Sequence, residues 1–521
     1  MDLLFNPAPE SQSPVFRQLA DHLTALVATG RVSAGAKLPA SRELAETLGL
    51  GRNTVSRAYE QLVTNGVCVA HVGQGTFVSA PPTGTATART VPLESDDPTP
   101  REFAWSGLFA RRAERAVLPP VLLGEQPPVR FDFRGGLVDG ASLPARDFAW
   151  AFSRALIGAK RVQELAAHRD PYGWMPLRQE VVRHLVSRGI HCEVEDVAIV
   201  NGSQHAIHLA ACTLVDPGDC VVVETPGYFG ATVALRSCEA HLIGVSVDED
   251  GLRTDELARV CQARRPKLIH VTPATQCPTG VRLSDARRQA LHEIANRYQV
   301  PIFEDDYDAE LRYFGAAVPA LKTRDEAGQI IYAGTFSKIL FPSLRLGYVV
   351  AARPLLRKMV AARWQADFGS PVVEQEAVAS LLRTGALDRH LKRVRAIYGS
   401  RLSTMLRVLE ESMPEGVSWS QPVGGQAVWV TVPSHLDGAG LRRAAEARGI
   451  AYASDAVFSL DGREGSSFML SFTSLEETPL AEGISELAGV IRSQLDRSAP
   501  TTNPTNPSKS PSGQEGNNDL T

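Results

Sequence analysis

The sequence is poor in the features that mark several specialised protein classes. Its 521 residues include seven cysteines, none in a Cys-x-x-Cys pair, and contain no run of eighteen uncharged apolar residues. The first observation excludes a zinc-ribbon framework and the second a membrane-spanning helix. The N-terminus, MDLLFNPAPESQSP, lacks the basic and apolar stretches of a secretion signal. We therefore expect a cytoplasmic protein with no membrane partner, with reduced cysteines packed in its core and with no bound metal.

The chain also lacks a large excess of positive or negative charge. The chain has 54 lysines and arginines against 58 aspartates and glutamates, so its net charge is only -4. This balance argues against a protein that coats nucleic acid or anionic membrane by bulk electrostatics. A hydrophobic content of 44% and a charged content of 21% are typical of a globular protein and exclude fibrous and disordered classes. The length predicts two or three folded units.

Residues 1–79 have the pattern of a small helical unit that ends in a hairpin. Apolar residues recur at helical spacing over 14–29, which predicts one amphipathic helix. A short helix follows, with Ser41 as its candidate N-cap and Gly49 at its end, and a third helix begins after the next glycine turn. Two helices joined by such a turn form a helix-turn-helix. The segment 67–78 then predicts a hairpin with a glycine tip, which would be a wing.

The rest of the chain divides by composition. Residues 80–128 are rich in proline, threonine and acidic residues, which predicts a linker, and 497–521 read as a polar disordered tail. Between them, 129–496 alternate short β-branched runs with helical stretches, which predicts βα units around a mostly parallel sheet. The expected fold is therefore a winged helix-turn-helix unit of α class followed by a larger α/β unit. The strand-like runs are 197–200, 220–223, 268–271, 301–303, 330–332 and 348–350.

The strongest site signal is a lysine at the end of a predicted strand. Lys338 closes the run Gly-Thr-Phe-Ser-Lys, and Arg345 follows seven residues later. Upstream, the acidic run that contains Asp305 and Tyr307 follows another predicted strand. Because parallel strands end at one edge of the sheet, where clefts bind ligands, we expect these side chains to share one site.

A second signal at the same edge is an anion-binding turn. The predicted strand 197–200 runs into Asn-Gly-Ser-Gln and then into a helix. Free backbone N–H groups and the positive end of the helix dipole converge at such a turn, which favours a phosphate. The N–H groups would come from Gly202, Ser203 and Gln204.

These motifs together resemble the fold-type I aminotransferases, which use pyridoxal 5'-phosphate, over about residues 129–496. The resemblance implies that Lys338 forms a Schiff base with the cofactor, that Asp305 holds the pyridine nitrogen protonated and that Tyr307 donates to the ring's phenolic oxygen. It also implies that Tyr228 stacks on the ring. The phosphate would be bound by the turn described above together with Arg345 and Thr335.

Two positions depart from the pattern of that family. Cys277 stands where the family usually has the asparagine of an Asn-Pro-Thr-Gly turn. Met469 stands where the family has an arginine for the carboxylate of the substrate. A thioether cannot bind a carboxylate in this way, so ordinary α-amino acids are not expected to occupy the pocket in the usual pose.

The N-terminal unit resembles the GntR-type winged helix-turn-helix over about sixty-five residues, through Leu-Pro-Ala-Ser-Arg-Glu-Leu-Ala, Arg-Asn-Thr-Val and Gly-x-Gly-Thr-Phe-Val. The resemblance implies binding to double-stranded DNA, although residues 1–79 contain six basic and six acidic residues and are not basic as a whole. Placement of single side chains at the groove would then provide the contacts. The expected DNA-binding residues are Ser41, Arg42, Arg52, Asn53, Thr54, Ser56, Arg57, Gly73 and Gly75.

The two resemblances in this order are those of the MocR-type regulators, in which a GntR-type DNA reader precedes an aminotransferase-like effector domain. This implies a homodimer that binds an operator and responds to a small amine or to the cofactor itself. One alternative is a working aminotransferase with an accessory N-terminal domain, against which Met469 counts. Another is a DNA-binding protein whose large domain only dimerises, which the set of Lys338, Asp305, Tyr307 and Arg345 disfavours.

Overall fold

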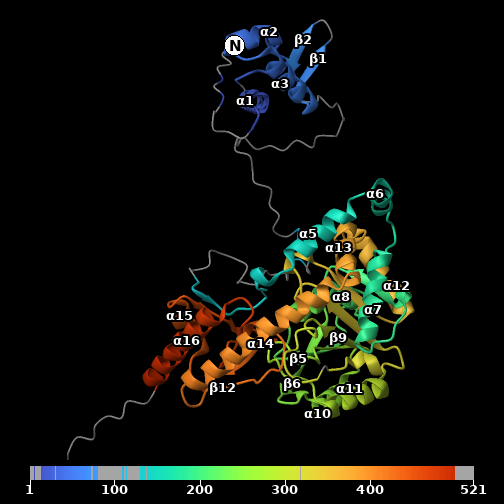
Figure 1. The fold of residues 1–521 in the computed structure, drawn as a ribbon, viewed down its shortest axis with the longest axis vertical. Helices are drawn as coiled ribbons and strands as arrows, with labels where there is room; N and C mark the ends of the chain where they lie inside the picture. The colour runs from blue at the N-terminus through green and yellow to red at the C-terminus, as the bar shows by residue number, and fades with distance from the viewer. Residues whose placement is uncertain are drawn as a thin grey trace, which may run out of the picture. The chain divides into compact units, whose positions relative to one another are not determined.

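The computed structural model divides the chain into two compact units, residues 1–104 and 105–521 (Figure 1). It describes residues 5, 7, 13–29, 31–71, 74–79, 108–110, 113, 129–136, 138–316 and 318–498. The predicted linker over 80–128 and the predicted tail over 497–521 lie almost wholly outside the described residues. Among the described helices, none combines the length and the apolar content needed to cross a membrane.

The small unit is a three-helix body followed by an antiparallel hairpin. Its elements are α1 (Val15–Ala28), α2 (Ser41–Leu48), α3 (Arg52–Thr64), β1 (Cys68–His71) and β2 (Gly75–Val78). Lys37 forms a β-bridge with Phe77, so the segment between α1 and α2 lies alongside the hairpin as a third extended stretch. This is the predicted winged helix-turn-helix.

One local prediction in this unit is wrong. Ser41 is the first residue of α2 and not its N-cap, a place taken by Ala40, which makes no side-chain cap. Ala40 has an extended backbone, with φ of -59° and ψ of 144°, so the helix already begins at Ser41, one residue earlier than predicted. Gly49 ends the helix in the left-handed conformation, with φ of 64°, as the sequence predicts.

The central sheet of the large unit has the order β4-β11-β10-β9-β8-β5-β6-β7. All neighbouring pairs are parallel except those formed by β11 and by β7, which confirms the prediction of a mostly parallel sheet. The strands are β4 (Val197–Val200), β5 (Cys220–Thr225), β6 (His241–Asp248), β7 (Gly251–Leu252), β8 (Leu268–Val271), β9 (Ile302–Asp306), β10 (Ile330–Thr335) and β11 (Gly347–Val350).

Helices cover both faces of this sheet, as Figure 1 shows. Adjacent strand residues point to different cores: Ile199 packs in one apolar cluster and Ala198 in another. Burial on both faces explains why these strands are almost uniformly apolar. The helices are α5 (Ala145–Ala155), α6 (Ala159–Ala166), α7 (Met175–Ser187), α8 (Ser203–Leu214), α9 (Phe229–Ser237), α10 (Thr254–Arg264), α11 (Asp285–Tyr298), α12 (Arg353–Asp367) and α13 (Val372–Arg383).

The C-terminal part of the large unit builds a second, smaller sheet of order β12-β13-β16-β15. The long helix α14 and the helices α15 and α16 pack beside it (Figure 1). A short strand from the start of the unit, β3 (Phe131–Asp132), pairs in parallel with β14. The remaining elements are α14 (Ala386–Ser412), β12 (Ser418–Trp419), β13 (Ala427–Thr431), α15 (Gly438–Glu446), β14 (Ile450–Ala451), β15 (Ala453–Ser454), β16 (Ser467–Ser471) and α16 (Glu477–Ser498).

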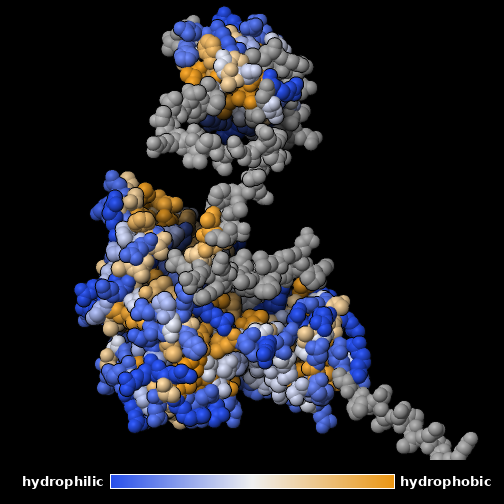
Figure 2. Space-filling model, turned by 180° about the vertical axis from the view of Figure 1, so that it is seen from behind, coloured by the Kyte–Doolittle hydropathy of each residue, from blue (hydrophilic) through white to orange (hydrophobic). Residues whose placement is uncertain are grey.

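Apolar side chains reach the surface of the large unit in several places. Figure 2 shows apolar surface at the end that carries α5 and α6, where Trp150, Leu156 and Ile157 are exposed. On α9, Phe229 and Val233 are also exposed. Single exposed apolar residues are ordinary, but groups of this kind mark candidate contact surfaces.

Candidate functional site

The predicted site residues of the large unit come from strand ends at one edge of the central sheet. The strands β9 and β10 are parallel neighbours, with Asp305 opposite Ala333. After β10 the chain turns through Ser337 and Lys338 and then returns antiparallel as β11. Asp305 lies inside β9 and not after it, because the strand continues through the acidic residues to Asp306.

Asp305 is a buried carboxylate that lacks a partner. Its residue is 2% exposed, and neither carboxylate oxygen accepts a hydrogen bond. The nearest basic group is Nε2 of His270 on β8, at 3.9 Å from Oδ2, and this nitrogen is also without a partner. Burying a carboxylate without a donor is costly, so the position fits a cationic or N–H group supplied from outside the chain. The pyridine nitrogen of pyridoxal phosphate is such a group.

Lys338 has the electrostatic setting of a reactive amine. Burial lowers the pKa of its ammonium group, and the Arg345 guanidinium lowers it further, against the opposing effect of Cys277, Asp308 and Asp305. A lysine with a lowered pKa holds more of its neutral, nucleophilic form near neutral pH. The same arrangement places Lys338 within electrostatic reach of Asp305 and Cys277.

The turn between β4 and α8 has the geometry expected of an anion cradle. Gly202 has φ of 84°, a left-handed value that favours glycine, and it is the N-cap of α8 without a side-chain cap. The first N–H groups of a helix have no partner within the helix, so those of Ser203 and Gln204 can meet an anion. Arg345 Nη2 donates to the Asn201 carbonyl at 3.3 Å, which brings a fixed positive charge to the same turn.

At this turn the Thr335 hydroxyl has hydrogen-bond partners within the chain and the Ser337 hydroxyl has none among the described residues, which differs from what the sequence led us to expect. Thr335 Oγ1 accepts from the Ser337 N–H at 3.2 Å and donates to the Leu346 carbonyl at 3.4 Å, so the turn itself uses it. Ser337 Oγ is buried and has no hydrogen-bond partner. A Cβ atom on Gly202 would lie 3.8 Å from this oxygen and 3.6 Å from Arg345 Nη2. Ser337 therefore carries the free hydroxyl at this turn, although the sequence pattern does not single it out.

Tyr228 and Tyr307 both lie near the lysine-bearing edge. Tyr228 is the N-cap residue of α9, and its hydroxyl donates to Gln204 Oε1 at 3.2 Å. The Tyr307 hydroxyl donates to the Thr275 carbonyl at 3.2 Å. Burial raises the pKa of both phenols, and the charge of Asp305 adds to the effect, so both stay protonated and available as donors.

Cys277 and Met469, the two positions that depart from the aminotransferase pattern, lie in a turn and on a strand of the second sheet. The turn at Cys277 is closed by a hydrogen bond from the Gly280 N–H to the Gln276 carbonyl at 2.7 Å. Burial raises the pKa of the Cys277 thiol, which keeps it neutral. Met469 lies on β16 opposite Trp429, and a Cβ atom built on Gly135 would lie 2.8 Å from its Cε.

Sequence reasoning missed several polar groups of this region. His270, Ser337 and Asp308 each carry a buried polar atom without a hydrogen-bond partner. Asp308 is also protonated more readily than usual, because burial and the charge of Asp306 raise its pKa. The sequence alone gives only a weak signal for them: a histidine inside an apolar strand, a serine before the lysine and one more acid in an acidic run.

The candidate DNA-binding residues of the small unit lie on α2, α3 and the hairpin. The side chains of Arg42, Arg52, Asn53 and Arg57 are exposed, those of Ser41, Thr54 and Ser56 are half-buried, Gly75 is exposed and Gly73 lies outside the described residues. Within the described part of the unit, the side chains of Arg42 and Arg52 form no hydrogen bond or ion pair. Arg57 differs, because its guanidinium lies 4.0 Å from the centre of the Phe16 ring on α1.

Packing fixes the orientation of α3 within this unit. Val55, Ala58, Tyr59 and Leu62 form its buried face. The Tyr59 hydroxyl donates to the Pro39 carbonyl at 2.8 Å, which ties α3 to the segment before α2. A helix held in this way presents its opposite face, with Arg52 and Asn53 at its N-terminal end, to solvent. The N-terminal residues of the second helix are those that reach base edges in helix-turn-helix proteins.

Comparison with known proteins relates both units to families. Residues 16–78 match the gntR family of bacterial regulatory proteins, and residues 151–460 match aminotransferase class I and II. The probable rhizopine catabolism regulatory protein MocR of Rhizobium meliloti is 30% identical over 487 residues, which cover 92% of this chain and 94% of that protein. The HTH-type transcriptional regulator TauR of Rhodobacter capsulatus is 31% identical over 494 residues, or 93% of this chain and 98% of that protein.

The large unit is also similar to a solved aminotransferase structure. LysN, the alpha-aminoadipate aminotransferase of Thermus thermophilus, complexed with N-(5'-phosphopyridoxyl)-L-leucine, gives a TM-score of 0.70 at 31% identity. The similarity covers 76% of this chain and 100% of that chain. Both units, in the same order, thus match over nearly the full length of two regulators. The chain belongs to the MocR-type regulators of the GntR family, in which a DNA-binding winged helix-turn-helix unit precedes an aminotransferase class I and II unit.

Proposed function

We propose that this regulator senses a small primary amine, or the cofactor itself, at Lys338 and passes the signal to its DNA-binding unit. The observation that carries the proposal is the unpaired, buried carboxylate of Asp305 beside a lysine of lowered pKa. A chain that used its large unit only for dimerisation would have no reason to retain this costly arrangement.

The cofactor is pyridoxal 5'-phosphate, whose aldehyde reacts with primary amines when it is bound. In the proposal, Asp305 pairs with its ring nitrogen and Lys338 holds its aldehyde carbon. The phosphate meets the N-terminus of α8, the Ser337 hydroxyl and Arg345, while Thr335 shapes the turn. The residues assigned to the cofactor are Lys338, Asp305, Tyr307, Tyr228, Gly202, Ser203, Gln204, Ser337, Arg345 and Thr335.

An amine effector would compete with Lys338 Nζ for the aldehyde carbon of the bound cofactor. Burial lowers the pKa of Lys338, so a released Lys338 would gain a proton less readily than a surface lysine. The resulting change in the contacts of Lys338 within the cleft would be the signal. Coupling between two sites is typically about 1–3 kcal/mol, which corresponds to a change in operator affinity of roughly 5- to 150-fold.

The effector we propose is an amine without an ordinary α-carboxylate, such as a non-α amino acid or an amino sulfonate. Met469 takes the place where the aminotransferase pattern has the arginine that binds the carboxylate of an α-amino acid. A thioether is a weak acceptor and provides no charged donor for that carboxylate. Common α-amino acids would therefore be poor effectors and slow amino donors.

The proposal also assigns the operator contacts and the cellular location. Six residues would face the bases and phosphates of the operator: Ser41, Arg42, Arg52, Asn53, Thr54 and Ser56. Three others would contact the sugar-phosphate backbone of the DNA: Arg57 and the hairpin residues Gly73 and Gly75. A protein that binds an operator acts where the DNA is, so we place this regulator in the cytoplasm.

A homodimer formed through the large unit is the assembly we propose. An open hollow beside the phosphate cradle is lined by Phe148, Phe152, Phe341 and Leu344 as well as by Arg345. Exposed Val233 borders it, at 51% exposure. An apolar hollow next to a ligand site suits a second copy of the same chain, because a two-fold pair would cover both hollows at once.

The test follows the cofactor and the operator together. Alanine, glutamate, β-alanine, γ-aminobutyrate and taurine are titrated against the cofactor-loaded protein while its visible absorbance and its affinity for upstream DNA are measured. We expect a non-α amine to change both, and the variant Lys338→Ala to lose the response while Lys358→Ala keeps it. Rapid conversion of alanine or glutamate to the oxo acid would instead support the alternative, a working aminotransferase with an accessory DNA-binding domain.

A further inference from the structure

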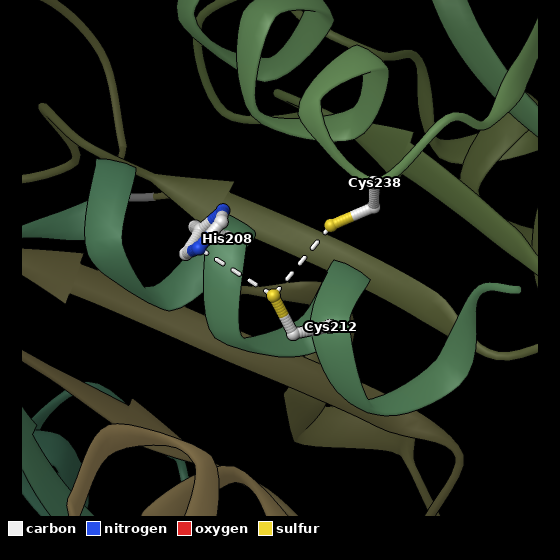
Figure 3. Close-up of side chains that lie close together, drawn as sticks. All are labelled: His208, Cys212 and Cys238. Carbon is white, nitrogen blue, oxygen red and sulfur yellow. Dashed lines mark hydrogen bonds between the residues drawn. The ribbon is translucent and has the colours of Figure 1, made fainter. Parts of the chain in front are cut away.

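A cluster of one histidine and two cysteines lies on the large unit. None of the three is among the residues assigned to the cofactor, but His208 lines the same open hollow as Gln204 and Arg345. Figure 3 shows the side chains of His208, Cys212 and Cys238 turned toward one another. Cys212 Sγ lies 3.5 Å from Cys238 Sγ and 3.4 Å from His208 Nε2. All three candidate ligand atoms lie within 4.8 Å of one another. The sequence predicts reduced thiols packed in the core, but Cys212 is exposed and Cys238 is half-buried.

The local fold explains why these residues meet. His208 and Cys212 are four residues apart on α8, so they share one face of that helix. Cys238 is the C-cap residue of α9, the next helix, which packs against α8. The spacing is therefore set by two packed helices and not by a loop. No Cys-x-x-Cys motif arises in this way, which is why the sequence pattern did not reveal the cluster.

The distances suit a tetrahedral metal ion. With Zn–S near 2.3 Å and Zn–N near 2.05 Å, the edges of a tetrahedral site are about 3.8 Å between two sulfurs and about 3.6 Å between sulfur and nitrogen. The two separations from Cys212 Sγ, 3.5 Å to Cys238 Sγ and 3.4 Å to His208 Nε2, differ from these by only a few tenths of an ångström. The third edge, between the candidate atoms of His208 and Cys238, is at most 4.8 Å long. Two thiolates and a neutral imidazole balance the charge of a divalent ion, and three protein ligands leave one position open for water.

The hydrogen bonds of Ser237 orient the histidine as a ligand. The Ser237 hydroxyl donates to the Ala234 carbonyl at 2.7 Å, and its oxygen lies 3.4 Å from His208 Nδ1. Because the serine proton is used in this way, its oxygen can accept from Nδ1–H. That tautomer leaves the lone pair on Nε2, the nitrogen that faces Cys212. Histidines that bind metals usually form such a hydrogen bond through the ring nitrogen that does not contact the metal.

We propose that His208, Cys212 and Cys238 bind a thiophilic d10 metal ion, with Zn²⁺ as the ion that the geometry fits best. The ion would link the C-terminal ends of α8 and α9, while their N-terminal ends are joined by the bond between Tyr228 and Gln204. The proposal does not depend on the nature of the effector or on operator binding.

The main competing reading of the two thiols is a redox-active disulfide pair. One observation favours the metal. A disulfide would give no role to His208 or to its orientation by Ser237, whereas a metal ion uses all three side chains.

Zinc titration of the full chain, without an affinity tag, tests the site. The protein is reduced with a non-thiol reductant, treated with a chelator, desalted and titrated with Zn²⁺ in competition with a chromophoric chelator. We expect one Zn²⁺ per chain, with an increase in the melting temperature. Cys212→Ser and Cys238→Ser should weaken binding more than Ser237→Ala, which should cost about 10- to 100-fold. Cys192→Ser, a half-buried cysteine outside the cluster, is the matched control and should bind as the unaltered chain does.

A spectroscopic measurement avoids dependence on the folding of any variant. Co²⁺ added to the unaltered reduced chain should give intense visible bands of tetrahedral coordination together with a sulfur-to-cobalt charge-transfer band. The proposal is overturned if the reduced chain binds no stoichiometric Zn²⁺, or if the Cys212→Ser/Cys238→Ser double variant binds it as tightly as the unaltered chain. It is also overturned if the chain binds no Zn²⁺ but loses two thiols on mild oxidation, which would identify a redox pair.

Discussion

At the scale of single residues, the chemistry of the large unit depends on groups that the chain leaves unsatisfied. Asp305 has two buried oxygens without donors, and Ser337 has a buried hydroxyl without a partner. Lys338 is destabilised in its charged form mainly by burial. A folded chain retains such costs where a ligand removes them. The three residues therefore form the part of the site that binding of pyridoxal phosphate would stabilise.

The first prediction concerns Lys338. Replacement of Lys338 by alanine removes the only amine that this part of the site supplies, so the visible absorbance of the purified protein should be lost. The cofactor should then be removed by gel filtration far more easily. Lys358→Ala, which removes an exposed lysine on α12, is the matched control. An unchanged absorbance spectrum in Lys338→Ala would show that another residue holds the cofactor.

Asp305 is positioned by an ion-pair network on the other side of β9. Its neighbour Asp306 accepts from Arg188 Nη2 at 2.7 Å and from the Tyr332 hydroxyl at 2.7 Å. Arg188 also contacts Glu310 at 3.3 Å. Burial would raise the pKa of Glu310, but Arg188 and then His184 outweigh this effect and lower it to about 2. The network thus depends on a charged Glu310.

The second prediction is a pH dependence of stability. A carboxyl group whose pKa is lowered on folding stabilises the fold above its unfolded pKa, and this contribution is lost as the pH falls toward the folded value. Glu310→Gln should therefore lower the free energy of unfolding by roughly 3 kcal/mol at pH 7, and by less than half of that at pH 3.

Urea unfolding of both proteins between pH 7 and pH 3 measures this difference. Glu411→Gln, which breaks an exposed pair with Arg407 on α14, is the control and should change stability by less than about 1 kcal/mol. A difference between Glu310→Gln and the unaltered chain that stays constant with pH would contradict the assignment.

At the scale of elements, the sequence predicts well where periodicity and turn residues agree. The apolar runs at 197–200 and 268–271 are strands with those limits, and Gly49 ends α2 as expected. The prediction failed where polar residues continue a buried strand: Asp305 lies within β9, although both of its carboxylate oxygens are buried without a donor from the described chain.

Contacts between packed helices were beyond the reach of the sequence. The cluster of His208, Cys212 and Cys238 exists only because α8 and α9 pack together, and local spacing within one segment cannot show this. Ser337 could have been found as part of the lysine-bearing turn, but only the structure shows that Thr335 is occupied and that Ser337 is free.

The third prediction concerns the recognition helix α3. Arg52 lies at its exposed N-terminal end, so Arg52→Ala should weaken operator binding by about 5- to 150-fold, the effect of losing a contact worth about 1–3 kcal/mol. Arg42→Ala, at the start of α2, should have a similar effect. Arg31→Ala removes the same charge from an exposed position outside both helices and should change affinity little. Gel-shift titrations at one salt concentration compare the three, and the reverse order would show that a different face meets the DNA.

At the scale of the whole molecule, the distribution of charge and apolar surface limits how the regulator can act. The small unit has no excess of basic residues, so a single copy gains little from non-specific attraction to phosphates. Two linked copies raise the effective concentration of the second reader once the first has bound. Operator affinity should therefore depend on self-association of the large unit, whose apolar hollow offers the surface for it.

The fourth prediction is that the cofactor-loaded chain sediments as a dimer at micromolar concentration, and that Val233→Asp shifts it toward monomer. Val233 borders the hollow and is 51% exposed, so the new charge costs the isolated chain little but would be desolvated at an interface. Val186→Asp, at 47% exposure on α7 and outside the hollow, is the matched control and should stay dimeric. If Val233→Asp lowers both the dimer fraction and the operator affinity, the result supports operator binding by two linked DNA-binding units. A monomer in the unaltered protein would contradict it, because the small unit alone has too little positive charge to bind its operator tightly.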